Sequence, residues 1–324
     1  MKENIMKTYI IVRTIGLTTR LLTLEDYIAL IRRIKSLYEL GYREAEGVSI
    51  EGYSEIRKVA AKTFISRLRF LASLKSPYTS LIESYLARLE AENIKIRIRE
   101  IYSQRSFREH YYPYEKSVPL KRIQEARRIE DLTKVLSETT YQKYLRRLFE
   151  ITEKPSREQL ELAVDSAYYY YLKQTAMKCK ASKHAITLLD MEGLVRLAYW
   201  LITIKEEIAK LKEAEILNGF KPVKTRVVEW LEVECIAETL GVNIHELREF
   251  MSRNKITEAI LLVEKSFVNK LEKYKKLYKM TDVIIVYYMI RSRIEMENLE
   301  RISLGEKYKI PFKELINYII APTV

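Results

Sequence analysis

Apolar side chains recur along most of the chain at intervals of three and four residues, which is the period of one face of an α-helix. Near the N-terminus this face comprises Tyr27, Leu30, Ile31 and Ile34. Thr23 precedes the stretch and is followed closely by two acids, a pattern typical of a helix N-cap and first turn. The sequence therefore predicts a helix that begins after Thr23 and buries this face.

Proline, serine and glycine mark the breaks between predicted helices. Ser76-Pro77 precedes a helix predicted over residues 79–102, and Pro155-Ser156 predicts the start of another. Eight glycines and seven prolines are few for 324 residues, whereas a strand-rich chain needs a turn about every 8–12 residues. The predicted fold class is therefore all-α.

Three short segments of the chain share one pattern. An acid, any residue and a second acid are followed by Asn or Gly and then by Ile or Leu. The segments begin at residues 90, 190 and 295, so that their spacings are 100 and 105 residues. Such near-equal spacing predicts three similar helical modules, which we place at residues 1–112, 113–218 and 219–324.

An apolar helix with an aromatic residue is predicted before each of these segments. The aromatic residues are Phe64, Tyr168 and Phe267. The last two lie in similar contexts, because Asp165 stands three residues before Tyr168 and Glu264 stands three residues before Phe267. This repeated context supports the interpretation as three modules.

The second half of each segment places polar residues four positions apart, on one helix face. Two interpretations of these residues stay open. They form solvated ion pairs worth a few tenths of a kcal/mol each, or they lie where helices cross and fix the packing by satisfied hydrogen bonds. Either role is structural. The residues concerned are Glu92, Asn93, Arg97, Glu192, Gly193, Arg196, Glu297, Asn298 and Arg301.

Catalytic and ligand-binding signatures are missing from the sequence. The histidines His110, His184 and His245 are isolated, and the spacing of Cys179 from His184 is not typical of metal ligands. Neither a glycine-rich phosphate-binding loop nor a G-x-S-x-G motif occurs. We therefore expect no catalytic residue, no cofactor and no metal, and we predict that the chain is not an enzyme.

The charge balance indicates an acidic partner. There are 57 Lys and Arg against 44 Asp and Glu, which gives a net charge of +13. The longest apolar runs, 197–204 (interrupted by Thr203) and 283–290, span eight residues each, and a membrane-spanning helix needs about 20. We expect a chain that does not cross a bilayer but can lie on one.

Residues 96–128 are both basic and aromatic, with tyrosines interleaved among arginines and lysines. Three interpretations stay open: a solvated linker, a docking surface for an acidic protein, or a surface where bases of single-stranded nucleic acid stack on the aromatic rings. The third makes a basic helical nucleic-acid-binding protein the alternative functional hypothesis. Reversing the charge of Arg105, Arg108, Lys121 and Arg122 would test it.

Taken together, these motifs resemble the C-type subunit of archaeal A-type and bacterial V-type rotary ATPases, which is similar to the d-type subunit of the eukaryotic vacuolar enzyme. The resemblance rests on residues 12–27, which contain Arg13, Arg20 and the Leu21-Leu22 pair. It rests further on the three acidic segments, most clearly 295–302, and on the terminal Lys309-Ile310-Pro311. It extends over essentially the full length of the chain.

The resemblance implies three similar helical bundles that form a funnel around a pseudo-threefold axis. It implies a non-catalytic rotor component that transmits torque during ion-coupled ATP synthesis or hydrolysis. The implied partners are the D- and F-type subunits of the central stalk and the membrane proteolipid ring, with anionic lipid headgroups as a further partner. The implied location is peripheral, on the cytoplasmic face of the cell membrane.

Overall fold

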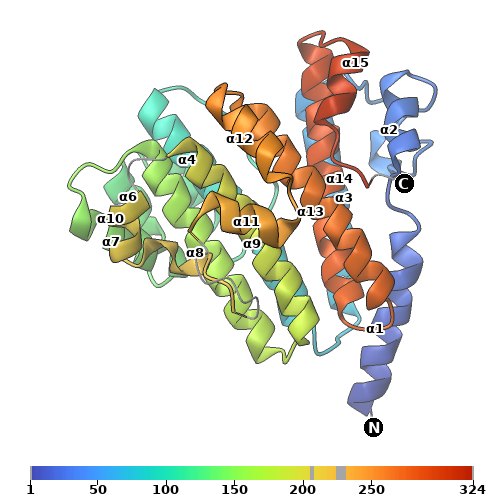
Figure 1. Cartoon of the computed structure of the whole chain (residues 1–324), viewed down its shortest axis with the longest axis horizontal. Helices are drawn as coiled ribbons and strands as arrows, with labels where there is room; N and C mark the ends of the chain where they lie inside the picture. Colours follow the sequence, from blue (N-terminus) through green and yellow to red (C-terminus); the bar gives the residue numbers. More distant parts are fainter. Residues whose placement is uncertain (1, 205–207, 224–230, 323–324) are drawn as a thin grey trace. The chain divides into compact units, whose positions relative to one another are not determined.

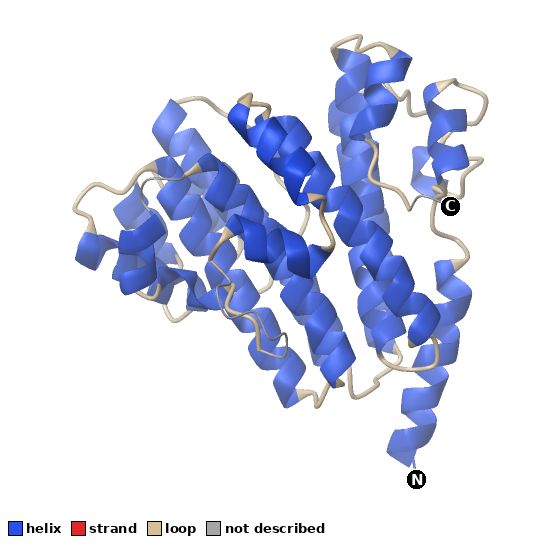
Figure 2. Cartoon of the chain, viewed as in Figure 1, coloured by secondary structure: helices blue, strands red, loops and turns tan. Residues whose placement is uncertain are grey.

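The structure is a computed structural model that describes residues 2–204, 208–223 and 231–322. Over these residues the chain is helical and contains no strand (Figure 2). The all-α prediction is therefore confirmed. The chain divides into two compact units (Figure 1): unit 1 comprises Met1–Ile82 and Leu261–Val324, and unit 2 comprises Glu83–Ile260.

Unit 1 is built around the long helix α14. Its elements are α1 (Lys2–Thr18), α2 (Leu24–Ile31), the 3-10 turn η1 (Arg43–Ala45), α3 (Tyr53–Ser73), most of α13 (Ile256–Leu277), α14 (Val283–Lys307), α15 (Phe312–Leu315) and the 3-10 turn η4 (Ile316–Tyr318). Helix α14 packs against α3 and α1 (Figure 1). Its first eight residues, the apolar run 283–290, are all buried, as expected of a helix that is apolar on every side.

Unit 2 combines long helices with several short ones. Its elements are most of α4 (Thr79–Ser103), the 3-10 turn η2 (Arg108–His110), α5 (Leu120–Glu125), α6 (Ile129–Val135), α7 (Thr140–Ile151), α8 (Arg157–Lys178), α9 (Lys183–Thr203), α10 (Ile208–Glu213), the 3-10 turn η3 (Ile216–Gly219), α11 (Val233–Leu240) and α12 (Ile244–Ser252). Helix α8 is central, because it packs against α7, α9 and η3.

Local rules explain where several helices begin. Thr23 caps α2: its hydroxyl accepts the amide of Asp26, while the Asp26 carboxylate accepts the amide of Thr23 at 3.1 Å. Ser156 and Gln159 form the same kind of capping box at α8. Both predicted helix starts are confirmed.

One detail of the first predicted helix was wrong. Helix α2 ends at Ile31, and Arg33 adopts a left-handed backbone conformation with φ of 58°. The apolar face therefore stops after Leu30 and Ile31, and Ile34 is 67% exposed instead of buried. The amide of Ile34 donates to the carbonyl oxygen of Ala29 at 2.8 Å, a hydrogen bond typical of a helix that ends in a left-handed residue.

The aromatic residues predicted in the preceding helices lie on α3, α8 and α13. Phe64, Tyr168 and Phe267 are each 1% exposed. No described helix is both long enough and apolar enough to cross a membrane. The division into modules 1–112, 113–218 and 219–324 stays a prediction.

Candidate functional site: polar anchors on three long helices

The repeated segments lie within three of the longest helices, α4, α9 and α14. Six of their polar residues are buried: Glu90, Asn93, Asp190, Glu192, Glu295 and Asn298 are each at most 2% exposed. A buried polar group is destabilising unless it is hydrogen-bonded, so the partners of these side chains show what the segments do. We call the three clusters the α4, α9 and α14 anchors, after the helix that carries each.

In the α4 anchor, two side chains of the helix form hydrogen bonds with the backbone of the loop that follows it. The carboxamide of Asn93 donates to the carbonyl oxygens of Tyr112 and Tyr114 at 3.0 and 3.1 Å, and it accepts the amide of Tyr112 at 2.8 Å. One oxygen of Glu90 accepts three successive amides, those of residues 116–118, at 2.6–3.0 Å. The loop between α4 and α5 is thereby fixed to the middle of α4.

The α14 anchor repeats this chemistry in unit 1. Asn298 donates to the carbonyl oxygen of Ile320 at 2.8 Å and accepts the amide of the same residue at 3.0 Å. Glu295 accepts the amide of Leu22 at 2.7 Å and pairs with Arg67 at 2.5 Å. It also accepts the hydroxyl of Tyr42. Burial and the charge of Glu295 raise the pKa of Tyr42 well above its ordinary value, so this hydroxyl remains a donor.

The α9 anchor lacks the asparagine, and two other side chains supply its functions. Gly193 occupies the asparagine position, and a β-carbon built there would lie 3.7 Å from the Nζ of Lys173 on α8. Lys173 donates to the carbonyl oxygen of Lys221 at 3.0 Å and pairs with Asp190 at 3.3 Å. Asp190 in turn accepts the amide of Val223 at 3.0 Å. As in the other two anchors, one donor (Lys173) and one acceptor (Asp190) bind the backbone of a loop later in the chain, here at residues 221–223.

Burial changes the ionisation of this lysine. The side chain of Lys173 is 3% exposed. Burial lowers the pKa of Lys173 to about 8, while the nearby charge of Asp190 limits the decrease. Burial therefore disfavours the charged form of this group, and the ion pair with Asp190 offsets part of that penalty.

Two of the three motif arginines, Arg196 and Arg301, join the motif helix to the long helix before it. In unit 2, Arg196 pairs with Asp165 of α8 at 2.5 Å, and Trp200 donates to the same carboxylate at 2.9 Å. In unit 1, Arg301 pairs with Glu264 of α13 at 2.8 Å. Asp165 and Glu264 are the two acids that the sequence places in similar contexts. A pair within one helix was one of the two interpretations of the four-residue spacing, whereas these two pairs connect two helices, as in the other interpretation.

The remaining motif residues also have defined partners. Glu192 accepts the hydroxyl of Tyr85 at 2.9 Å and lies 3.6 Å from Arg88. Glu297 pairs with Arg293 at 2.5 Å. Arg97 donates to the carbonyl oxygen of Ala126 at 2.6 Å and pairs with Glu100 at 2.6 Å. Glu192 therefore lies at a crossing between α9 and α4, whereas Arg293–Glu297 and Arg97–Glu100 are ion pairs within one helix.

A buried ion network that the sequence did not indicate connects α4 to α8. Lys95 is fully buried and pairs with Glu92 and with Asp165, both at 2.7 Å. Burial opposes the charged form of Glu92, but Lys95, Arg196 and Arg88 outweigh it and lower the pKa of that carboxyl well below its ordinary range. Asp165 likewise has a lowered pKa, because Arg196 and Lys95 outweigh its burial. Both carboxyls are therefore ionised at neutral pH.

Three tyrosines of the basic segment 96–128 are buried and cannot serve as stacking surfaces. Tyr111, Tyr112 and Tyr114 are 8%, 5% and 7% exposed. Asn93 holds the backbone of the last two, and the hydroxyl of Tyr111 donates to Glu100 at 2.6 Å. The nucleic-acid interpretation required rings that face solvent, so the burial of these three rings weakens it, although Tyr102 in the same segment is 45% exposed.

Within the residues that the structure describes, no group of His, Cys, Asp and Glu could hold a metal ion. In a comparison with protein families, the model of the ATP synthase (C/AC39) subunit matches residues 10–318. A comparison with curated proteins gave no match.

Proposed function

The chain belongs to the ATP synthase (C/AC39) subunit family, whose members are structural components of A/V-type ATP synthases, and from this premise we propose that it is part of the rotor. In this proposal it links the central stalk to the membrane proteolipid ring and transmits torque without performing chemistry itself. The observation that carries the proposal is the family match over residues 10–318.

The three anchors support the proposal because a rotor subunit must transmit force while its helices keep their positions relative to each other. Helices packed by apolar contacts alone can shift along each other, because the hydrophobic effect is non-directional. A buried ion pair is directional, and removing one partner is destabilising by about 3–5 kcal/mol. Each shift of α9 along α8 would separate Arg196 from Asp165, and each shift of α14 along α13 would separate Arg301 from Glu264.

The repeated pairing of helices supports the three-module arrangement that we propose. An aromatic-bearing helix precedes each motif helix: α3 precedes α4, α8 precedes α9 and α13 precedes α14. We propose that these pairs form three similar bundles around a central cavity, as a funnel that receives the foot of the central stalk and its D- and F-type subunits.

The basic charge supports a peripheral location, on the cytoplasmic face of the membrane beside the ring. Each Lys or Arg near an anionic membrane surface contributes about 1 kcal/mol of binding free energy. The net charge of +13 thus favours contact with anionic lipid headgroups as well as with acidic protein surfaces.

Affinity purification from gently solubilised membranes tests the proposal. A tagged chain should co-purify with the proteolipid ring and with the central-stalk subunits. A matched preparation of the Asp165→Asn variant should give a weaker complex, because Lys95 and Arg196 then lose their shared carboxylate. Recovery of the unmodified chain with neither the ring nor the stalk would contradict the proposal.

A further inference from the structure

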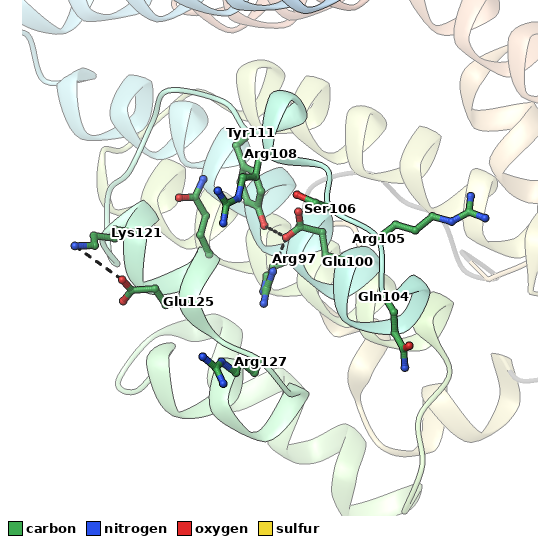
Figure 3. Close-up of a pocket in the computed structure, with 11 residues that line it drawn as sticks. Arg97, Glu100, Gln104, Arg105, Ser106, Arg108, Tyr111, Lys121, Glu125 and Arg127 are labelled. Carbon is green, nitrogen blue, oxygen red and sulfur yellow. Dashed lines mark hydrogen bonds and ion pairs between the residues drawn. The ribbon is translucent and has the colours of Figure 1, made fainter.

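A basic cavity of about 950 Å³ lies in unit 2, beside the C-terminal end of α4 (Figure 3). Its lining comes from α4, from the loop that contains η2, from α5 and from the residues directly after α5. The lining residues are Arg97, Glu100, Gln104, Arg105, Ser106, Arg108, Tyr111, Lys121, Gln124, Glu125 and Arg127. Cavities of this size are typical of sites for small molecules.

The buried acid of the lining does not contribute free negative charge. Glu100 has a side chain that is 5% exposed, and it receives donors from three residues at 2.6 Å: Arg97, the hydroxyl of Tyr111 and the amide of Phe107. Burial raises the pKa of Glu100, but these hydrogen bonds outweigh it and the pKa lies below its ordinary value. Both oxygens of the carboxylate thus have donors, and its charge is paired with Arg97, as Figure 3 shows together with the contact from Tyr111.

Three cations of the lining have no counter-ion among the described residues. The guanidinium groups of Arg105, Arg108 and Arg127 form no ion pair with any residue that the structure describes. Lys121 lies 3.9 Å from Glu125, at the outer limit of an ion pair, and its side chain is 84% exposed. The cavity therefore carries an excess of positive charge that an anionic ligand can neutralise.

We propose that this cavity binds a small, multiply charged phosphate compound without a base or other aromatic group. Arginine presents a planar fork of donors that matches the oxygens of a phosphoryl group. Gln104, Ser106 and Gln124 add neutral donors for the same oxygens. Inorganic polyphosphate and inositol polyphosphates share this chemistry, so both are included in the class.

The lining favours such a ligand over a nucleotide or a nucleic acid. Recognition of a base uses an aromatic face or a planar stack. Tyr111 is the one aromatic residue among the described residues of this lining, it is 8% exposed, and its hydroxyl is bound to Glu100. The site should consequently recognise charge and phosphoryl geometry, and an attached nucleoside should add nothing.

Isothermal titration calorimetry on the full chain at low ionic strength tests this inference. The probes are inorganic tripolyphosphate, inositol hexakisphosphate, ATP and poly-glutamate. Tripolyphosphate or inositol hexakisphosphate should bind at one site, more weakly as salt is added, and ATP should bind no more tightly than tripolyphosphate. The probe that binds better identifies the source within the class.

Charge reversal in the cavity supplies the control. Arg108→Glu/Arg127→Glu should weaken binding by at least about tenfold, since each charged hydrogen bond is worth that much or more. Lys143→Glu/Arg146→Glu, on exposed positions of α7 outside the lining, changes the net charge equally and should leave binding unchanged. Where charge reversal prevents folding, Arg108→Gln/Arg127→Gln replaces it.

Four results would overturn the inference: no binding of either phosphate probe, equal losses in the cavity and control variants, tighter binding of ATP than of tripolyphosphate, or equal binding of poly-glutamate. Equal binding of poly-glutamate would indicate that the cavity binds an acidic protein segment instead. These measurements use the isolated chain, so they are independent of whether the protein assembles into a rotor.

Discussion

Replacing Lys173 by Met tests whether this lysine performs the function of the missing asparagine. The change removes the donor to the carbonyl oxygen of Lys221 and leaves Asp190 buried with the amide of Val223 as its partner. Breaking a buried ion pair on one side is destabilising by about 3–5 kcal/mol. Because Asp190 keeps one donor, we expect a loss of about 3 kcal/mol in the free energy of unfolding.

A second substitution should recover part of this loss. A β-carbon at Gly193 would meet Tyr169 at 3.5 Å and the end of Lys173 at 3.7 Å, which are ordinary contact distances. With Lys173 shortened to Met, Gly193→Asn restores a carboxamide at the position that Asn93 and Asn298 occupy in the other anchors. We expect Lys173→Met/Gly193→Asn to be more stable than Lys173→Met by at least about 1 kcal/mol, within the range of measured coupling energies.

Urea unfolding, followed by circular dichroism, and hydrogen exchange of the Val223 amide provide the two readouts. The exchange measurement reports the loop directly, whereas the unfolding curve reports the whole chain. Gly193→Asn alone should be destabilising, because Lys173 then occupies the space that the carboxamide requires. If the two single losses simply add in the double variant, Lys173 does not replace the asparagine and the reasoning fails.

The same lysine predicts a pH dependence. Its pKa is about 8 in the folded chain and 10.5 ordinarily, so the unfolded chain binds more protons between these values. Stability should therefore rise as the pH increases from about 8 to about 10.5, by about 3 kcal/mol in total. Below about pH 8 the unfavourable burial of the charge is present in full. Lys173→Met should lack this rise when unfolding is measured across the same pH range.

Three further predictions concern the other anchors and the ion network. Asn298→Asp removes the donor to the C-terminal segment and should cost about 1–3 kcal/mol, with faster proteolysis near residue 320 as the readout. Asp165→Asn should lower the stability of unit 2 by about 3–5 kcal/mol, measured by thermal unfolding. Glu158→Gln, at a partly exposed position in the first turn of α8, should change it by less than about 0.5 kcal/mol, because it breaks only a partly exposed ion pair. The lowered pKa values of Asp165 and Glu92 mean that both carboxylates stabilise the folded chain at pH values above the ordinary carboxyl pKa. This stability should be lost as the pH falls below that value. In Asp165→Asn, the free energy of unfolding should depend less on pH over the same acid range.

Local features of the fold could be predicted because they depend on neighbouring residues. Thr23 and Ser156 cap helices by contacts three residues away, so the sequence contains all the information required. Ile34 was misplaced because helical periodicity alone does not show where a helix ends. The left-handed residue at Arg33, a bulky side chain where glycine is more usual, gave no signal.

The partners of the anchors could not be predicted, because they lie far away in the sequence. Asn93 binds a loop 19–21 residues later, and Arg196 pairs with an acid 31 residues earlier. The periodicity of a helix identifies which residues share a face but not which loop returns to it. Lys173 was missed for the same reason, although the glycine at position 193 was itself a signal that another side chain occupies the space.

A chain with three similar segments faces a hazard during folding, because one segment can dock onto the loop of another. Asn93 and Asn298 present a donor and an acceptor on one side chain, whereas Lys173 and Asp190 present them on two helices. The loop at residues 221–223 would therefore meet the wrong geometry on either of the other two motif helices. A lysine on a neighbouring helix, in place of an asparagine on the motif helix, thus distinguishes the middle segment from the other two and protects the folding chain against exchange of its own parts.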